Sequence, residues 1–350
     1  MNKIFLLFDC RLDNNDKQWL ADGLEIDDFV VESVGTSVKL TDIVHKGVCG
    51  RLRNYLIQIK QCCQTIHKSD NNDIIIVWYS VTGQIMNLLS RCCGGRNLVL
   101  MNFLTPSKRP WPLGWLLKNT VNNPNNSILV NSPESMAQYR NLFHLKDNRG
   151  SRFHFFPDVY NNTDDFVKPR TKCNRYFFTG GMTNRDWNLV FEIAKSLPDE
   201  RFVCCALSED FEKQERERPQ NVELHFNLPS NEYYRLMEDS YCVLLPLKNN
   251  AVAGLINILK ALQLGVPCCV SETTATKQYF HSNNRDFLLP KKLEAWTDQI
   301  KHIVGMSDSE YIRTVQGMQR FIQDNFSPES GIMRLQVIIN QINKNKYFCK

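Results

Sequence analysis

The feature that most constrains the fold is a regular alternation of short apolar runs with longer amphipathic runs. Residues 73–79, DIIIVWY, are apolar almost throughout, which is typical of a strand in a parallel sheet covered on both faces. Strands are predicted at 3–9, 29–34, 73–79, 97–103, 127–131 and 152–156, and helices at about 50–67, 82–92, 111–121 and 133–143. Such alternation indicates an α/β fold.

Residues 160–174, YNNTDDFVKPRTKCN, interrupt this rhythm with a polar, turn-rich segment. Strands then resume near 175–179, 201–205, 222–226, 241–246, 267–271 and 286–289. The helices fall at about 185–196, 209–217, 230–239, 255–264, 275–280, 291–304, 307–324 and 328–344. A chain of 350 residues has room for two cores. We therefore predict two doubly wound, Rossmann-like domains facing a cleft, 1–168 and 169–327, followed by a helical segment, 328–350.

Composition and charge exclude several classes of protein. No window approaches the ~18 apolar residues that span a bilayer. The N-terminal apolar run covers only Ile4 to Phe8 before Asp9, so we interpret it as a buried strand and expect a cytoplasmic protein. The net charge of +5 permits an anionic partner, but no dense basic stripe interleaved with aromatic residues indicates nucleic acid.

The 13 cysteines include four adjacent pairs, but no two are spaced as Cys-x-x-Cys. Most lie in apolar runs, where a thiol behaves as a small hydrophobic group. We expect reduced cytosolic thiols, with a disulfide framework or a metal site as the alternatives.

Two glycine-containing loops follow strands of the second domain. In 177–187, FFTGGMTNRDW, a strand ends at Gly180-Gly181 and a helix follows, with Arg185 near its start. In 248–271, KNNAVAGLINILKALQLGVPCCVS, Lys248 follows a strand and Gly254 precedes a helix. Glycine admits a ligand close to the backbone, and a helix N-terminus presents free N–H groups to an anion. Alternatively, the first loop is a plain strand-to-helix turn with a solvated Arg185. In the second loop, Gly254 would then be a turn residue before a helix whose apolar side chains simply pack on the sheet.

Both loops are expected at the carboxyl edge of one sheet, where doubly wound folds bind ligands. Together they favour a diphosphate as the ligand. It would contact Arg185, Lys248 and the N–H groups that follow Gly254. The other candidate donor-site residues on the second loop are Leu255, Ile256 and Asn257.

Over roughly 176–330, four segments follow one another along the chain: FTGGMTNRDWNLVFEIAKSLPDERFVCCA, NVELHFNLPSNEYYRLMEDSYCVLLPL, AGLINILKALQLGVPCCVSE and FIQDNFSPES. This half of the chain resembles the nucleotide-sugar-binding domain of GT-B glycosyltransferases, in particular family 4, glycosyl transferases group 1. The segment SILVNSPESMAQY is loosely similar as well. The order and spacing are fairly specific, whereas no single motif is.

The resemblance implies transfer of a sugar from a nucleoside diphosphate sugar, without metal or cofactor, by a retaining, hexosyltransferase-like enzyme. In that family the backbone beside Gly181 and the cation at Arg185 contact the donor diphosphate. The region of Asn227 and Leu228 lies against the nucleobase. The final helix of the family crosses back to the first domain, which suits 328–344.

The sequence departs from the family at one position. The family commonly carries two glutamates here, and the later one, which usually binds the ribose hydroxyls, is replaced by Lys260. An ammonium accepts no hydrogen bond. The loop before Gly254 also lacks an acid, and Glu272 is the candidate for a substitute carboxylate.

The first domain is expected to hold the acceptor, a glycan or a lipid-linked sugar. Asp9, Arg11, Ser80 and Asn102 lie near carboxyl ends of its strands and are the candidate cleft residues. Ser80 also has the pattern of a helix N-cap, which is its more common role.

Residues 105–118, TPSKRPWPLGWLLK, combine Lys108, Arg109 and Lys118 with Trp111 and Trp115. This mixture suits a peripheral contact with anionic lipid at the inner face of the membrane. Such a segment is more often a proline-bent connection whose tryptophans pack in the core.

We therefore predict a glycosyltransferase that acts in surface polysaccharide biosynthesis. Two alternatives stay open. A sugar-nucleotide epimerase of the same fold would need acids and histidines in the cleft, and the sequence offers few. A binding or partner protein that keeps the fold with reduced activity is favoured by Lys260.

Overall fold

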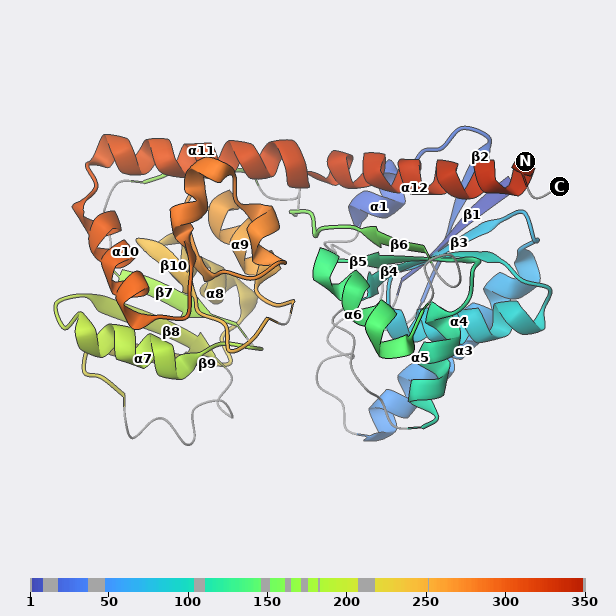
Figure 1. The fold of residues 1–350 in the computed structure, drawn as a ribbon, viewed down its shortest axis with the longest axis horizontal. Helices are drawn as coiled ribbons and strands as arrows, with labels where there is room; N and C mark the ends of the chain where they lie inside the picture. The colour runs from blue at the N-terminus through green and yellow to red at the C-terminus, as the bar shows by residue number, and fades with distance from the viewer. Residues whose placement is uncertain are drawn as a thin grey trace. The chain divides into compact units, whose positions relative to one another are not determined.

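A computed structural model describes residues 2–8, 18–36, 48–103, 111–145, 152–160, 165–170, 176–181, 183–206, 218–250 and 252–348. The chain divides into two compact units, residues 1–157 with 328–350 and residues 158–327. Each unit contains a six-stranded sheet whose strands pair in parallel (Figure 1). The predicted α/β class is confirmed.

The first unit has the strand order β2-β1-β3-β4-β5-β6. Its elements are β1 (Asn2–Leu7), α1 (Gln18–Gly23), β2 (Phe29–Val34), α3 (Val48–Lys68), β3 (Ile74–Val77), α4 (Ser80–Cys92), β4 (Asn97–Phe103), α5 (Leu113–Val121), β5 (Asn126–Val130), α6 (Pro133–Phe143), β6 (Arg152–Phe155) and α12 (Pro328–Phe348). Helices α3, α4 and α5 pack side by side along one face of the sheet, and α1 packs against α12 (Figure 1).

The second unit has the strand order β12-β11-β10-β7-β8-β9. Its elements are β7 (Tyr176–Gly180), α7 (Trp187–Ser196), β8 (Arg201–Ala206), β9 (Val222–Phe226), α8 (Ser230–Glu238), β10 (Cys242–Leu245), α9 (Leu255–Gln263), β11 (Cys268–Ser271), two 3-10 segments (Thr276–Tyr279 and Ser282–Phe287), β12 (Leu288–Leu289), α10 (Leu293–Gly305) and α11 (Asp308–Phe326).

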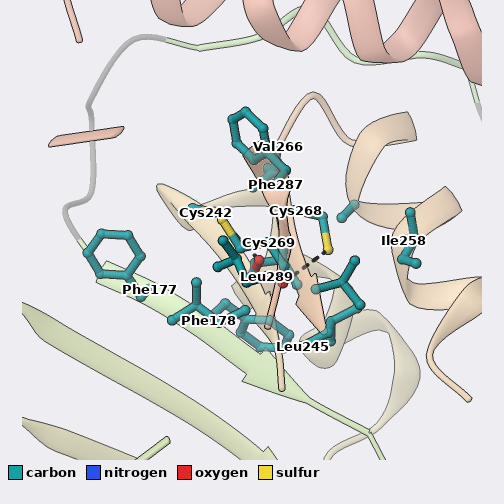
Figure 2. Close-up of a cluster of buried hydrophobic side chains, with 14 of the residues drawn as sticks. Phe177, Phe178, Cys242, Leu245, Ile258, Val266, Cys268, Cys269, Phe287 and Leu289 are labelled. Atoms are coloured by element: carbon teal, nitrogen blue, oxygen red, sulfur yellow. Dashed lines mark hydrogen bonds between the residues drawn. The ribbon is translucent and has the colours of Figure 1, made fainter. Parts of the chain in front are cut away.

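The apolar strands form the centre of each unit because both faces of each sheet are covered. In the second unit, Phe177 and Phe178 of β7 pack with the cysteines of β10 and β11 (Figure 2). Cys242, Cys268 and Cys269 are fully buried there. Burial raises the pKa of the Cys204 and Cys205 thiols, and the nine cysteines whose side chains the structure describes are free.

Asp158 and Val167, both expected in the first domain, are bonded to the second unit. The backbone N–H of Asp158 donates to the Tyr279 hydroxyl at 2.9 Å, and that of Val167 donates to the Gln263 carbonyl at 2.8 Å. These contacts place the change of unit after residue 157. At the other end, α12 belongs to the first unit, where the Gln336 amide donates to the Glu25 carbonyl at 2.7 Å.

Two further expectations differ from the structure. Helix α4 begins at Ser80 and its N-cap is Tyr79, which makes no side-chain capping bond, so the N-cap interpretation of Ser80 is wrong. Helix α1 was not predicted, because six residues are too few to show a helical period. The predicted helix at 209–217 lies outside the described residues.

Candidate functional site

The two glycine-containing loops meet at the point where the strand order of the second sheet reverses. From β7 the chain continues toward β8 and β9, and from β10 it continues to β11 on the other side, although β7 and β10 are hydrogen-bonded neighbours. Doubly wound sheets bind ligands beyond the carboxyl ends of the strands at such a switch point.

Backbone hydrogen bonds fix the two loops to each other. Arg185 forms an isolated antiparallel bridge with Leu247. The Asp186 N–H donates to the Pro246 carbonyl at 2.9 Å, and the Lys248 N–H donates to the Asn184 carbonyl at 3.0 Å. Segments that are 62 residues apart in sequence therefore form one backbone platform, as the count from 185 to 247 shows.

Arg185 lies inside this platform with only 4% of its surface exposed. Its Nε donates to the Gly180 carbonyl at 2.7 Å, and one terminal nitrogen donates to the Thr183 carbonyl at 3.2 Å. In the described part of the chain, no carboxylate lies within ion-pair distance of the guanidinium. Burial lowers the pKa of Arg185, because the charged guanidinium is held away from water.

Two glycines allow the guanidinium to lie there. A Cβ on Gly181 would lie 2.5 Å from a terminal nitrogen of Arg185, and a Cβ on Gly254 would lie 3.4 Å from both of them. Both glycines have positive φ, +133° and +78° respectively, a region that favours glycine. The sequence therefore needs glycine at both positions for steric and conformational reasons.

Gly254 is also the N-cap of α9, and no side chain caps this end of the helix. The first intrahelical bond runs from the Ile258 N–H to the Gly254 carbonyl, so the N–H groups of the three preceding residues lie ahead of it. Those groups carry the positive end of the helix dipole. The guanidinium and the helix end therefore present positive charge at one place.

Asn257 and Tyr233 complete the inner side of the site. The Asn257 amide donates to the Gly180 carbonyl at 3.1 Å and to the Tyr233 hydroxyl at 3.0 Å. Burial raises the pKa of Tyr233, so its hydroxyl stays protonated at neutral pH. Sequence reasoning named Asn257 but missed Tyr233, although the tyrosine pair in SNEYYRL lies at the start of a helix that follows β9.

The remaining donor-side candidates lie in different surroundings. Lys248 is exposed, and Lys291, which sequence reasoning missed, donates to its carbonyl. Lys260 lies with its Nζ 5.0 Å from the centre of the Tyr234 ring. Glu272 is exposed and pairs with Lys277 at 2.9 Å, so its carboxylate already has a partner.

Three candidates belong to the helix start and the nucleobase region. Leu255 is buried and Ile256 is exposed at the first turn of α9. Asn227 is exposed with φ +52°, directly after β9, and Leu228 packs at the edge of the core. Their roles toward a ligand stay predictions.

The first unit has its own switch point, between β1 and β3. The Trp78 N–H donates to the Leu7 carbonyl at 3.0 Å, and the Trp78 ring lies 6.2 Å from those of Phe8 and Trp19. This aromatic group was missed from sequence. Ser80 is half-buried at the start of α4, and Asn102 has φ +54° at a register irregularity of β4. Asp9 and Arg11 lie outside the described residues.

The described part of segment 105–118 does not pack its tryptophans in the core. Trp111 is 83% exposed and Trp115 is 49% exposed, so that interpretation is wrong. Lys108 and Arg109 lie outside the described residues.

No group of three or more His, Cys, Asp or Glu side chains in the described residues is placed to hold a metal ion. Among the described helices, none combines the length and the apolar character required to cross a membrane.

No protein-family model matches the chain, and no curated protein matches its sequence. Solved structures are similar to it in fold. Sucrose-phosphate synthase from Thermosynechococcus elongatus has a TM-score of 0.69 at 13% identity, over 99% of this chain and 100% of that one. HepE from Anabaena, solved with UDP, has a TM-score of 0.67 at 12% identity, over 97% and 100%.

A third similar structure is trehalose-6-phosphate synthase from E. coli, bound with UDP-2-fluoro glucose. Its TM-score is 0.67 at 8% identity, over 97% of this chain and 98% of that one. These neighbours are GT-B glycosyltransferases, so the chain has the GT-B fold. At these identities the likeness concerns the fold alone.

Proposed function

We propose that this GT-B-fold chain transfers a sugar from a nucleoside diphosphate sugar to a glycan or a lipid-linked acceptor. The observation that carries the proposal is the buried guanidinium of Arg185, which has no carboxylate partner in the described residues and lies beside Gly181 and Gly254. An isolated buried cation is costly, and a bound anion offsets that cost. A diphosphate fits because the guanidinium and the α9 N-terminus lie together.

In the proposed reaction, the bond between the sugar and the diphosphate breaks and negative charge grows on the leaving diphosphate. Arg185 and the first N–H groups of α9 are fixed by the fold, so they stabilise that charge with little reorganisation. Lys248 and Lys291 are exposed and add positive charge beside the β10–α9 loop. In this proposal the chain itself supplies the charge stabilisation, so neither a metal nor a cofactor is needed.

The finer parts of the proposal concern the acceptor, the stereochemistry of the transfer and the place of the protein in the cell. We infer a retaining, hexosyltransferase-like reaction in surface polysaccharide biosynthesis, by a cytoplasmic protein that contacts the membrane through 105–118. The exposed Trp111 and Trp115 favour that contact. In the aromatic group near the first switch point, Phe8 and Trp19 are buried, and the half-buried Trp78 is the ring that an acceptor could contact.

Two alternatives make different predictions. A binding or partner protein with reduced activity would bind the nucleotide but transfer no sugar, and Lys260 favours it. A sugar-nucleotide epimerase needs acid and base groups near the sugar. The groups that contact Arg185 and Asn257 are backbone carbonyls and a tyrosine hydroxyl, which disfavours an epimerase.

Calorimetric titration with UDP, GDP and ADP tests the donor site. We expect one of the three to bind, with the same affinity in EDTA as in Mg²⁺. UDP comes first because two of the similar structures contain UDP or a UDP-sugar. If none of the three binds, the donor-site proposal is wrong. If a nucleotide binds but labelled nucleotide sugars are neither hydrolysed nor transferred, the partner-protein alternative holds.

Lys260 provides a second test. We expect Lys260→Glu to strengthen UDP binding relative to inorganic pyrophosphate, because a carboxylate accepts hydrogen bonds from ribose hydroxyls whereas an ammonium does not. The gain expected for hydrogen bonds to a charged group is ~1.5–3 kcal/mol. Lys260→Gln is the control for loss of the positive charge. An unchanged ratio of the two affinities would place the ribose away from position 260.

A further inference from the structure

Helix α3 turns its larger apolar side chains toward solvent. Its buried side carries Gln58, Gln61, Cys62 and Thr65. Its exposed side carries an apolar stripe at the spacing of one helix face, namely Leu52, Tyr55, Leu56 and Ile59, of which Leu56 is 68% exposed. An amphipathic surface helix normally has the opposite arrangement.

Polar contacts fix this rotation of the helix. The Gln61 amide donates to the Val34 carbonyl at 2.9 Å and to the Phe8 carbonyl at 3.3 Å, at the carboxyl ends of β2 and β1. The Thr65 hydroxyl and the Cys62 thiol are buried on the same side. Rolling the stripe inward would break the Gln61 bonds and leave the buried Phe8 carbonyl and the part-buried Val34 carbonyl without that donor, which is unfavourable.

The neighbouring helices expose apolar side chains as well. Helix α4 packs between α3 and α5, and it exposes Leu88. At the start of α5 and just before it, Trp111, Leu113 and Trp115 are exposed. We call the exposed apolar residues of α3, α4 and 111–115 the α3–α5 surface. Apolar side chains gathered on one face mark an interaction site more often than scattered ones do.

The charges carried by α3, α4 and α5 themselves have one sign. No Asp or Glu occurs in α3, α4 or α5, nor anywhere in residues 74–133, although the whole chain has 37 acidic residues in 350. The described basic side chains of these helices are Arg53, Lys60, Lys68, Arg91 and Lys118. Lys68, at the end of α3, is paired with Glu32 at 3.5 Å, so the other four carry the positive charge of this surface. Arg91 bonds to Asn119 at 3.0 Å, which places its charge where α4 meets α5.

We propose that the α3–α5 surface docks on a membrane leaflet that contains anionic lipid. Exposed tryptophan, tyrosine and leucine beside lysine and arginine, with no acid among them, is the composition of an interfacial surface. Anionic headgroups attract each nearby cation, and the apolar side chains enter the acyl boundary. The inference rests on the proposed function for its purpose, because a docked enzyme reaches a lipid-linked acceptor.

Co-sedimentation with vesicles tests the proposal, with no nucleotide present. We expect the protein to bind vesicles of phosphatidylcholine mixed with phosphatidylglycerol, to bind pure phosphatidylcholine more weakly, and to dissociate as salt is raised. Leu52→Ser with Leu56→Ser should reduce binding by about tenfold or more, because two apolar side chains no longer enter the lipid. Arg53→Gln with Lys60→Gln should reduce binding to the mixed vesicles only.

Met333→Ser with Val337→Ser is the matched control, because these residues of α12 are 60% and 57% exposed but lie outside the α3–α5 surface. The control should bind vesicles as the wild type does, and thermal unfolding should show that all variants are folded.

Failure of the wild type to sediment with anionic vesicles overturns the proposal. A dimer that separates in the Leu52 and Leu56 variant, with no vesicle binding by the wild type, assigns the surface to a second copy. Nucleotide titration without vesicles tests the donor site separately, so either idea can fail alone.

Discussion

Replacing Arg185 with methionine is expected to weaken diphosphate binding by ~1.5–3 kcal/mol, roughly 10- to 150-fold, without lowering the stability of the fold. Methionine fills a similar volume with no charge, so it removes a buried cation that the described chain does not neutralise. The Gly180 carbonyl keeps its hydrogen bond from Asn257. The exposed Thr183 can turn to water.

The two effects are measured separately. Titration with UDP or pyrophosphate gives the affinity, and thermal unfolding without ligand gives the stability. Arg185→Ala should lose the same affinity but should also lose stability, because it leaves a cavity beside β7. The distinguishing result is therefore the methionine variant, which is as stable as the wild type or more stable yet fails to bind.

Arg96 offers a matched control in the first unit. It is also buried, at 8% exposure, and in the described part of the chain its hydrogen bonds go to a hydroxyl, an amide oxygen and backbone carbonyls and not to a carboxylate. Its guanidinium donates to the Ser69 hydroxyl and to the carbonyls of Ser69, Cys93 and Gly95. Arg96→Met should lower the melting temperature, because these acceptors lose their donor, and should leave nucleotide affinity unchanged. If Arg185→Met unfolds as easily as Arg96→Met and the Arg185 variant keeps its affinity, Arg185 is a structural residue.

The fold could be predicted from the sequence because each strand is a short apolar run with turn-forming or helix-capping residues at its ends. The run at 97–103 and the structure agree in full, and Ser132-Pro133 marks the start of α6 as N-cap and first residue. Where the local sequence pattern is less specific, the predicted first residue of a helix is less accurate. Ser80 has the chemistry of an N-cap, but the helix begins there instead.

The site was only partly predictable, because its shape depends on strand order. Local sequence located Gly181, Arg185 and Gly254, but the burial of Arg185 follows from β7 lying beside β10. That neighbour relation joins the first and fourth strands of the unit, and no short window contains it. The same reason explains why Tyr233, from α8, was missed.

Which side of α3 is buried could not be predicted from the sequence, for a different reason. A pattern of leucine and isoleucine at helical spacing normally predicts the buried side. Here Gln61 bonds to two strand ends and sets the rotation, so polar residues face the sheet. Hydrophobic periodicity predicts that the helix exists, whereas a specific polar contact decides which side of it is buried.

Replacing Gly181 with alanine is expected to reduce both stability and diphosphate binding. A residue with a side chain at φ +133° is strained, and such strain costs about 1–3 kcal/mol. In addition, the new Cβ would lie 2.5 Å from a terminal nitrogen of Arg185, so the buried guanidinium must move. Displacing it separates it from the α9 N-terminus, and affinity for UDP should fall.

Gly265→Ala is the matched control for strain. Gly265 also has positive φ, +76°, and a Cβ there would lie 2.7 Å from the Val167 carbonyl oxygen. It precedes β11, at the amino end of that strand, whereas the candidate site lies beyond carboxyl ends. We expect this variant to lose stability while keeping its nucleotide affinity. Equal affinities in the Gly181 and Gly265 variants would contradict the role given to Gly181.

The double variant Gly181→Ala with Arg185→Met separates strain from collision. If the alanine Cβ acts by displacing the guanidinium, its stability cost should be smaller when residue 185 is methionine, because a flexible uncharged chain moves aside easily. The two substitutions should therefore be non-additive in unfolding free energy, as contacting residues are. Additive costs would mean that Gly181 is required for its backbone conformation alone. A reduced cost would show that the glycine is needed to make room for the cation.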